Sequence, residues 1–326
     1  MTMLYPLKFR PILKTLVWGG EKIAPFKNIK TDQHNIGESW ELSGVKGNES
    51  VVAGGPLDGK TITELVREYR ERLIGKSNYA RTGEEFPLLI KFIDARQDLS
   101  IQVHPDDALA ARRHNGSKGK TEMWYVISAD KDAHLMSGLS RKITPEEYVE
   151  RVNNNTITDV LHDYSLSPGD VFFLPAGRIH SIGSGSFIAE IQQTSDITYR
   201  IYDFGRPGLD GKPRELHTEL AKDAIDYTVH DDYRTHYTPE KDKETVLVSC
   251  KYFTTSLLDL DRPFTKDLSG LDSFLILICT AGKGEIIDDR GNRTPVHQGE
   301  TVLIPAEASS LQIVPEGTLK MLASFV

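Results

Sequence analysis

The chain has 326 residues, and its 39 lysines and arginines against 47 aspartates and glutamates give a formal net charge of −8. That length suffices for about two domains, and a composition of 26% charged and 39% hydrophobic residues excludes a disulfide-stapled miniprotein, a fibrous protein and a disordered chain. The acidic balance also argues against a general attraction to nucleic acid or to anionic membranes.

The N-terminal part of the chain predicts one strand followed by one amphipathic helix. The strand covers residues 50–55, where β-branched residues are followed by glycines. The helix covers residues 61–74, because Thr61 and Glu64 form a capping box and the apolar residues after them recur at helical spacing. This helix should bury one face against a sheet.

The middle of the chain predicts mainly short strands, rich in β-branched and aromatic residues and interrupted by two helices. One helix starts with Thr144 as its N-cap, Pro145 at the first helical position and Glu147 as the capping-box glutamate. The other follows Pro213. The predicted strands cover residues 87–95, 99–105, 122–128, 170–175, 187–195 and 197–204, and the helices cover residues 144–152 and 215–227.

The C-terminal part predicts only strands, over residues 244–260, 273–279 and 300–305. Many short strands bounded by Gly, Pro, Asp and Asn are typical of β-sandwiches and β-barrels. We therefore predict a mainly β fold in which a few helices cover the sheets.

The two cysteines, Cys250 and Cys279, lie in apolar runs without a CxxC spacing. This predicts buried thiols in a reducing compartment. The strongest apolar run, residues 274–279, is far shorter than the ~20 residues that cross a bilayer, and the N-terminus lacks a continuous apolar region. We expect a cytoplasmic protein without a membrane anchor.

An internal repeat divides the chain into two related parts. Residues 167–182 (SPGDVFFLPAGRIHSI) align without gaps with residues 297–312 (HQGETVLIPAEASSLQ), and residues 122–133 align with residues 274–285. The two blocks lie farther apart in the first copy, by about the length of the helical stretch that begins at Thr144. The sequence therefore predicts two related β-modules.

The repeat also acts as an internal control for function. Glu122 in the first copy aligns with Phe274 in the second, and His180 aligns with Ser310. A residue needed only for the shared fold should occur in both copies. The difference therefore marks Glu122 and His180 as candidate functional residues and indicates that the second module is chemically silent.

Four side chains are candidates for one metal site. Gln102 and His104 are two residues apart on a predicted strand and so face the same side of a sheet, while Glu122 begins a strand and His180 follows a turn. Imidazole, carboxylate and amide oxygen are ligands for a divalent metal such as zinc, iron or manganese. Without a tight motif such as HExxH, their spacing alone fits ordinary structural residues equally well.

These residues stand in motifs that resemble a known family. The pattern G-D-x-x-x-x-P-A-G-x-x-H at residues 169–180 resembles the second motif of the cupin barrels, which are double-stranded β-helix (jelly-roll) domains that hold a metal ion. Together with Q-V-H-P-D-D at residues 102–107, G-K-T-E-M-W at residues 119–124 and S-D-I-T-Y-R-I-Y-D at residues 195–203, it closely resembles the type I mannose-6-phosphate isomerases (phosphomannose isomerases), particularly their short bacterial form.

The resemblance implies two cupin-type modules with short helical insertions: a catalytic, metal-binding domain over residues 1–240 and a degenerate domain without metal ligands over residues 241–326. It implies a zinc-dependent aldose–ketose isomerase with one Zn²⁺ per chain that interconverts mannose 6-phosphate and fructose 6-phosphate, and neither nucleic acid nor membrane as a partner. The metal ligands that it implies are His104, Glu122, His180 and, as in longer relatives, Gln102.

The resemblance also implies catalytic roles for three residues. Arg200 is permanently cationic and suits either the enediolate oxygens or the phosphate, although it could instead pair with Asp196 or Asp203 at a strand edge. Lys120, two residues before Glu122, suits a proton shuttle, although it could be a solvated lysine of a turn. Asp196 suits a role in opening the sugar ring, although a structural role in a turn explains this residue equally well.

Such an isomerase moves a carbonyl between C1 and C2 through a cis-enediolate, which requires a base and an electrophile; Lewis-acidic zinc suits the second role. Arg206 and Lys212, in the loop over residues 205–214, are further candidates for binding the phosphate. Trp40 is interpreted as a core residue.

Two other functions fit the same residues. Two histidines and one carboxylate also form the facial triad of non-heme Fe(II) oxygenases, for which iron content and O₂ consumption would be diagnostic. A non-catalytic sugar-binding or regulatory barrel would show ligand-induced stabilisation without turnover. A regulator is disfavoured because no DNA-reading helix pair or basic face is recognisable.

Overall fold

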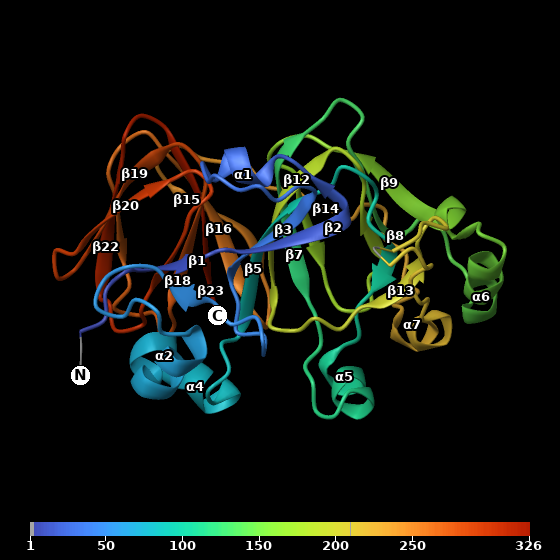
Figure 1. Ribbon diagram of the computed structural model, residues 1–326, viewed down its shortest axis with the longest axis horizontal. Helices are drawn as coiled ribbons and strands as arrows, with labels where there is room; N and C mark the ends of the chain where they lie inside the picture. The colour runs from blue at the N-terminus through green and yellow to red at the C-terminus, as the bar shows by residue number, and fades with distance from the viewer. Residues whose placement is uncertain (1–2, 209) are drawn as a thin grey trace.

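The computed structural model describes residues 3–208 and 210–326. Two groups of β-sheets lie side by side, with short helices along one edge and at one end of the molecule (Figure 1). The predicted mainly β fold, built from two jelly-roll modules, is confirmed.

In the first module a seven-stranded sheet faces a five-stranded sheet. Side chains from both sheets, among them Ile93, Trp124, Leu135 and Ile182, form one buried apolar cluster between them. The larger sheet has the order β14 (Arg234–Thr235), β10 (Val171–Leu174), β7 (Glu122–Ala129), β12 (Ser186–Gln193), β5 (Leu88–Asp94), β3 (Ile36–Leu42) and β2 (Ile12–Gly20). The smaller sheet has the order β13 (Tyr199–Tyr202), β6 (Ile101–Val103), β11 (His180–Ile182), β8 (His134–Leu139) and β9 (Leu161–Ser165).

The second module pairs a seven-stranded sheet with a four-stranded sheet, and its interior is filled by apolar side chains such as Leu275, Leu277, Leu311 and Ile313. The larger sheet has the order β15 (Glu244–Ser249), β16 (Thr254–Leu260), β23 (Leu319–Phe325), β18 (Leu275–Ala281), β21 (Thr301–Ile304), β1 (Leu7–Arg10) and β4 (Val51–Val52). The smaller sheet has the order β17 (Phe264–Asp267), β22 (Ser310–Pro315), β19 (Lys283–Asp288) and β20 (Arg293–His297).

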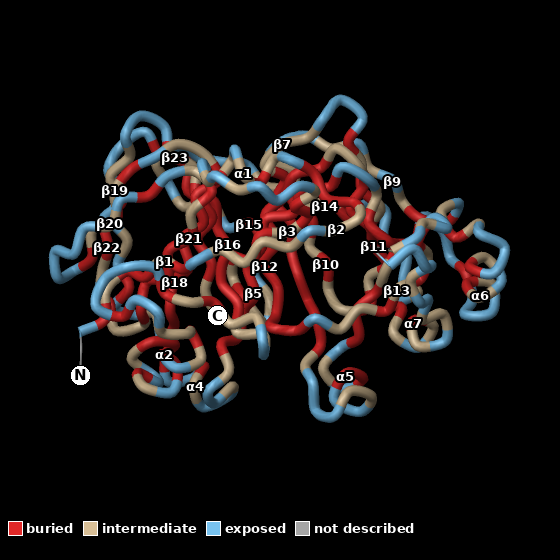
Figure 2. The backbone as a smooth tube through the Cα atoms, in the orientation of Figure 1, coloured by how far each residue is buried: buried red, intermediate tan, exposed pale blue. Residues whose placement is uncertain are grey.

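A further apolar cluster lies between the modules and joins their larger sheets. Ile90 and Met123 contribute from the first module, and Ile276 and Leu322 contribute from the second. Buried segments accordingly run through the middle of the molecule in Figure 2. The modules therefore share a core rather than meeting only through polar surfaces.

The N-terminal strand completes a sheet of the second module, because β1 pairs with β21 and places Leu7 opposite Leu303. This pairing joins a strand of residues 1–240 to a strand of residues 241–326. The division of the chain into domains with these bounds stays a prediction.

The helix expected over residues 61–74 starts as predicted, since the Thr61 side chain accepts from the Glu64 N–H and the Glu64 carboxylate accepts from the Thr61 N–H. It is interrupted at Arg70, whose φ of 49° cannot continue an α-helix. The helices are α1 (Ile23–Phe26), α2 (Ile62–Tyr69), α3 (Glu71–Ile74), α4 (Lys76–Thr82), α5 (Asp107–Arg113), α6 (Pro145–Asn153), the 3₁₀ turn Ile157–Val160 and α7 (Thr218–Ala224).

Three local predictions need correction. The expected strand over residues 244–260 is a hairpin, because the Cys250 N–H donates to the Phe253 carbonyl and turns the chain between β15 and β16. Cys250 is consequently half-buried at this turn, whereas Cys279 is buried as predicted; both are free thiols. Thr144 caps α6, but the Glu147 carboxylate binds neighbouring arginines in place of closing a capping box.

Equivalent strands of the two modules pair in the same way, which confirms the repeat. The structural alignment of its upstream block, residues 122–133 with residues 274–285, differs from the sequence alignment by one residue. Glu122 lies opposite Leu174, and the equivalent position opposite Ile304 is Leu275, not Phe274. Because side chains alternate across a sheet, this shift exchanges the two faces. Leu275 therefore points into the second module at the place where Glu122 points into the first, and the loss of the carboxylate is confirmed with this corrected partner.

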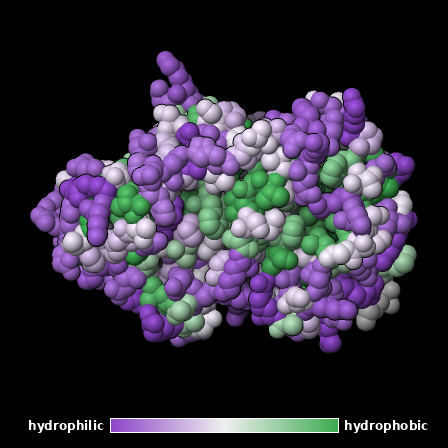
Figure 3. All heavy atoms as spheres, turned by 180° about the vertical axis from the view of Figure 1, so that it is seen from behind, coloured by the Kyte–Doolittle hydropathy of each residue, from purple (hydrophilic) through white to green (hydrophobic). Residues whose placement is uncertain are grey.

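No helix within the described ranges is long and apolar enough to cross a membrane. Seen from behind, the surface is largely hydrophilic, and apolar residues gather near the middle of the face (Figure 3).

Candidate active site

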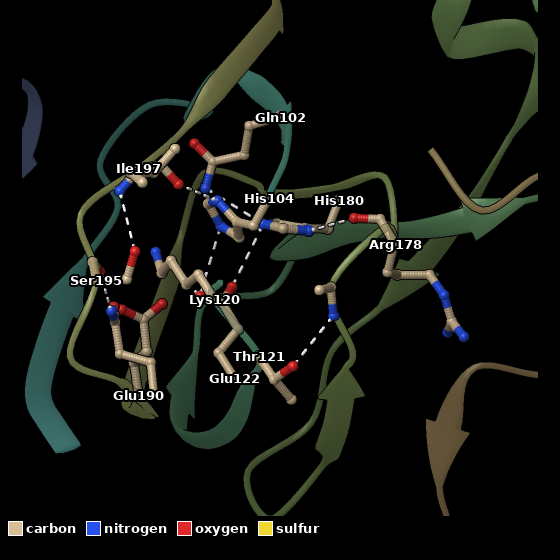
Figure 4. A network of polar contacts seen from close by, with 12 residues as sticks. Gln102, His104, Lys120, Thr121, Glu122, Arg178, His180, Glu190, Ser195 and Ile197 are labelled. Carbon is tan, nitrogen blue, oxygen red and sulfur yellow. Dashed lines mark hydrogen bonds and ion pairs between the residues drawn. The ribbon is translucent and has the colours of Figure 1, made fainter. Parts of the chain in front are cut away.

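Both sheets of the first module carry the candidate metal ligands toward its interior (Figure 4). Glu122 is the first residue of β7 in the larger sheet. Gln102 of β6 and His180 of β11 lie opposite each other in the smaller sheet, and His104 directly follows β6. The structure thus brings together the four side chains that the sequence predicts to meet.

The two imidazoles lie close together, and each approaches a different oxygen of the carboxylate. His104 Nε2 is 3.6 Å from Glu122 Oε2, and His180 Nε2 is 3.3 Å from Glu122 Oε1. One potential ligand atom from each residue lies within 4.8 Å of the others, and none of the three side chains is more than 2% exposed.

The hydrogen-bonding pattern of this cluster fits a divalent cation. His104 Nδ1 lies 2.9 Å from the Ile197 carbonyl and His180 Nδ1 lies 2.8 Å from the Arg178 carbonyl. A carbonyl only accepts, so each Nδ1 carries the proton and each Nε2 presents a lone pair. His104 Nε2 and Glu122 Oε1 are buried without a hydrogen-bond partner among the described residues, and Glu122 Oε2 has the Lys120 ammonium as its ion-pair partner. These unpartnered acceptors converge as metal ligands do.

Burial also prepares the ligands electrostatically. Burial, together with the nearby Lys120 ammonium, lowers the pKa of His104 well below the ordinary value and the pKa of His180 to about 3. Both imidazoles are therefore neutral at neutral pH, as metal ligation requires. Burial raises the pKa of Glu122 to about 7, against the opposing effect of Lys120. A positive charge close to this buried carboxylate would stabilise its ionised form.

Gln102 and Lys120 separate the cluster from an adjoining cavity. Gln102 Nε2 lies 3.3 Å from His180 Nε2, so the amide end of this side chain borders the cluster. Lys120 Nζ lies 3.0 Å from Glu122 Oε2, and its side chain is only 6% exposed. This burial excludes the solvated-turn interpretation of Lys120.

The cavity has a volume of about 610 Å³ and is large enough for a sugar phosphate. Its wall includes five of the residues named in the sequence analysis, and cationic side chains line it from several strands. The residues that line it are Leu13, Lys14, Thr15, Leu16, Trp18, Glu38, Trp40, Lys91, Ile93, Leu99, Ser100, Gln102, Lys120, Ile182, Glu190, Asp196, Thr198, Arg200 and Arg214.

Arg200 lies in the cavity wall on β13, opposite Gln102 of β6. Its Nη1 donates to the Glu215 carbonyl at 2.9 Å, whereas its buried Nε has no partner among the described residues. Burial and the neighbouring Arg214 lower the pKa of Arg200. The Asp203 carboxylate, an alternative partner for Arg200, binds Arg214 instead.

Asp196 is exposed at the rim of this cavity and also lines a second cavity of about 440 Å³. The two phosphate candidates in the following loop, Arg206 and Lys212, are not among the described residues that line the main cavity, and Arg206 binds Asp203 instead. Arg214 of the same loop does line it. Leu209 of this loop lies outside the described residues.

Sequence reasoning missed a buried ion pair in the cavity wall. Lys91 Nζ lies 3.0 Å from Glu190 Oε1 and 4.0 Å from Glu38 Oε1. Burial opposes both charges, yet their contact raises the pKa of Lys91 and lowers that of Glu190. The available signal was a charged residue in the interior of each of two mainly apolar strands, LLIKFID and SFIAEIQQ.

Trp40 is buried, as predicted, but it lines the cavity and does not belong to an apolar cluster of the core. The ammonium groups of Lys14 and Lys91 lie 4.9 Å and 5.2 Å from its ring centre. Trp40 is thus a buried hydrophobic residue, as predicted, and its ring also forms part of the cavity wall close to two cations.

Two family models match the chain. One, described as phosphomannose isomerase type I, catalytic domain, covers residues 7–121, and the other, mannose-6-phosphate isomerase, cupin domain, covers residues 243–326. Mannose-6-phosphate isomerase ManA of Bacillus subtilis (strain 168) is 35% identical over 302 residues, which are 92% of this chain and 93% of the relative. Mannose-6-phosphate isomerase of Streptococcus mutans is 33% identical and covers 99% of this chain and 98% of its own length.

Solved structures show the same similarity. The mannose 6-phosphate isomerase from Bacillus subtilis superimposes with a TM-score of 0.89 at 31% identity, covering 98% of this chain and 99% of its own. A mutant of phosphomannose isomerase from Salmonella typhimurium gives a TM-score of 0.79 at 16% identity, covering 97% and 98%, which shows a shared fold alone.

Proposed function

The chain belongs to the type I phosphomannose isomerase family and is a mannose-6-phosphate isomerase, and from this premise we propose that it uses one zinc ion and a cis-enediolate to interconvert mannose 6-phosphate and fructose 6-phosphate. The observation that supports the zinc proposal is the buried Glu122 carboxylate, which has Lys120 as its ion-pair partner at Oε2, has no hydrogen-bond partner at Oε1 among the described residues, and lies next to the Nε2 atoms of two imidazoles.

His104, Glu122 and His180 are the proposed ligands, and Gln102 is the candidate for the fourth position. A zinc ion bound there would supply a Lewis acid that polarises the sugar oxygens next to C1 and C2. Gln102 and Lys120 lie both beside the cluster and in the cavity wall, so they bring the substrate and the proposed ligands into one space.

The remaining residues have roles set by charge and position. Lys120 is the candidate to move the proton between C2 and C1, because its Nζ lies beside the ligand carboxylate and in the cavity wall, where the neutral amine would accept the proton from one carbon and return it to the other. Arg200 is the candidate to stabilise the negative enediolate oxygens or hold the phosphate, because its Nε is buried and unpartnered among the described residues. Asp196, at the cavity rim, is the candidate to assist ring opening.

The test combines metal analysis and turnover on the same purified sample. Fructose 6-phosphate formation from mannose 6-phosphate is followed in a coupled assay for the wild type and for the variants His104→Ala, Glu122→Ala and Arg200→Ala. We expect about one zinc per wild-type chain, and losses of at least ~10²-fold in kcat for each variant, with zinc lost only in the first two. His297→Ala, a partly exposed histidine of the second module, is the matched control.

Turnover close to wild type in the ligand variants would contradict the site. Iron in place of zinc, together with O₂ consumption, would favour the oxygenase, which the same donor set permits.

The proposal extends to location and partners. The net charge of −8, the two free thiols and the sugar-phosphate substrates favour a cytoplasmic enzyme whose partners are small molecules. The second module, over residues 241–326, serves as a partner without metal ligands, because apolar side chains occupy its interior.

A further inference from the structure

One of the groups that hold the loop carrying Lys120 is the carboxylate of Asp107, at the start of α5. Asp107 Oδ1 accepts from the Gly119 N–H at 3.0 Å and from Gln193 Nε2 at 3.2 Å. Its other oxygen, Oδ2, accepts from the Tyr252 hydroxyl at 2.7 Å. Three segments far apart in the sequence therefore meet at this side chain.

Gln193 holds the other side of Lys120. Its Oε1 accepts from the Thr121 N–H at 2.9 Å, and its own backbone N–H donates to the Thr121 carbonyl at 3.1 Å. Gly119 and Thr121, on either side of Lys120 in the sequence, are thus held by the side chains of Asp107 and Gln193, which also contact each other. The direction of the Lys120 side chain depends on both contacts.

The same loop is pressed against the chain that follows His104. A Cβ atom on Gly119 would lie 2.6 Å from the Asp107 nitrogen and 2.8 Å from the Pro105 carbonyl oxygen, so only glycine permits this approach. The Lys120 N–H donates to the same Pro105 carbonyl at 3.2 Å. The contacts between the Gly119–Lys120 segment and the Pro105–Asp107 segment therefore lie next to both His104, a proposed metal ligand, and Lys120, the proposed proton carrier.

Tyr252 reaches this support from the second module, where it lies in the turn between β15 and β16. Its ring packs against the apolar cluster shared by the modules, and this packing restrains the position of the hydroxyl. Lys251 also approaches Asp107 Oδ2, at 3.8 Å, but its side chain is 75% exposed and so contributes little. The Tyr252 hydroxyl is therefore the less exposed of the two partners of Asp107 Oδ2, and it restrains the rotation of the Asp107 carboxylate.

We infer that Tyr252 is a positioning residue through which the second module, itself without metal ligands, orients Lys120 in the first. The inference rests on the proposed role of Lys120. Small displacements of a reacting group reduce the rate strongly while leaving substrate binding nearly unchanged. Tyr252 acts on kcat through Asp107 and the loop, without touching the substrate.

The test compares Tyr252→Phe with Tyr237→Phe. Tyr237 packs against the same shared cluster and its hydroxyl also makes one hydrogen bond, to the Gly169 carbonyl at 2.6 Å, but away from the cavity. We expect Tyr252→Phe to lower kcat about three- to tenfold with KM within about twofold, and Tyr237→Phe to change neither. Equal losses of kcat in both variants would overturn the inference, because they would indicate a general effect of the shared core.

Two further measurements do not depend on a loss of activity alone. Hydrogen–deuterium exchange of the peptide over residues 117–123 should be faster in Tyr252→Phe and unchanged in Tyr237→Phe, since the Asp107 carboxylate that accepts from the Gly119 N–H and from Gln193 loses its contact with Tyr252. In the Asp107→Ala background, Tyr252→Phe should change kcat by less than about twofold, as expected of two residues in one chain of contacts. Independent, multiplying effects would overturn the inference.

These outcomes are distinguishable from a failure of the proposed function. A Glu122→Ala enzyme that keeps its turnover contradicts the metal site. Unchanged exchange and unchanged kcat in Tyr252→Phe contradict the positioning role, whatever the metal site proves to be.

Discussion

At the residue scale, Glu122 needs a positive charge close by. Its carboxylate is fully buried, and its described contacts are two neutral imidazoles and the Lys120 ammonium at 3.0 Å. A buried carboxylate without compensation costs several kcal/mol, and the group responds by binding a proton or a cation. The raised pKa of about 7 is the first response, and a metal ion between the imidazoles would provide the second.

His134 provides a pH-dependent test at the same scale. Its ring lies between two carboxylates, with Nε2 3.2 Å from Asp98 Oδ1 and Nδ1 2.9 Å from Asp163 Oδ1. The hydrogen bond with Asp98 and then that with Asp163 raise the pKa of His134 to about 9. The resulting stability is fully present below the unfolded pKa of about 6.5 and is lost as pH rises through about 9.

We therefore expect His134→Gln to lower the free energy of unfolding by about 1 kcal/mol at low pH, a value reduced for the partial exposure of the three side chains. Urea denaturation at about pH 6 and about pH 10 checks the sign, since the difference from wild type should vanish at the higher pH. A difference that grows with pH would contradict the raised pKa.

At the scale of elements, one exposed residue interrupts a helix that the sequence predicts as continuous. Arg70 adopts φ 49° and ψ −126° between α2 and α3, a conformation that L side chains rarely adopt. Gly83, after α4, adopts nearly the same angles, φ 60° and ψ −125°, with the residue type that suits them. The helical periodicity continues through Arg70, so the sequence has no local signal for the break.

Replacing Arg70 with glycine should therefore raise the free energy of unfolding by about 0.5–1 kcal/mol, because the strain of a Cβ at positive φ is removed. Gly83→Ala is the matched control and should lower it by a similar amount. Thermal and urea unfolding of both variants provide the measurement, and a destabilised Arg70→Gly protein would contradict the strain.

At the scale of the whole molecule, a buried ion pair accompanies the apolar cluster between the modules. Lys27 Nζ lies 2.6 Å from Glu41 Oε2 and also donates to the Gly299 carbonyl of the second module. The second Glu41 oxygen accepts from the Ser39 hydroxyl at 2.6 Å. Because both charges are buried, removal of one leaves the other without compensation.

Lys27→Met should lower the free energy of unfolding by about 3–5 kcal/mol, and Lys27→Met with Glu41→Gln should recover most of the loss, because no charge then remains buried. Urea denaturation measures both, and we expect one cooperative transition, since the modules share a core. A loss below ~1 kcal/mol for Lys27→Met would show that the pair contributes little to the junction.

Local patterns in the sequence determined the β class, the repeat, the start of α2 at Thr61 and the candidate ligands. Each depends on short-range spacing: alternation places Gln102 and His104 on one face, and a capping box needs residues three apart. The loss of the Glu122 equivalent in the second copy was also readable, although its partner, Leu275, emerged only from the strand register.

The tertiary structure alone decided which residues surround these ligands. Lys91, Glu190 and Trp40 reach the cavity, and Tyr252 contacts Asp107 from 145 residues away, because of how separate sheets pack against one another. No periodicity along the chain encodes such contacts. They depend on register, twist and shared burial between distant strands, which are properties of the folded molecule.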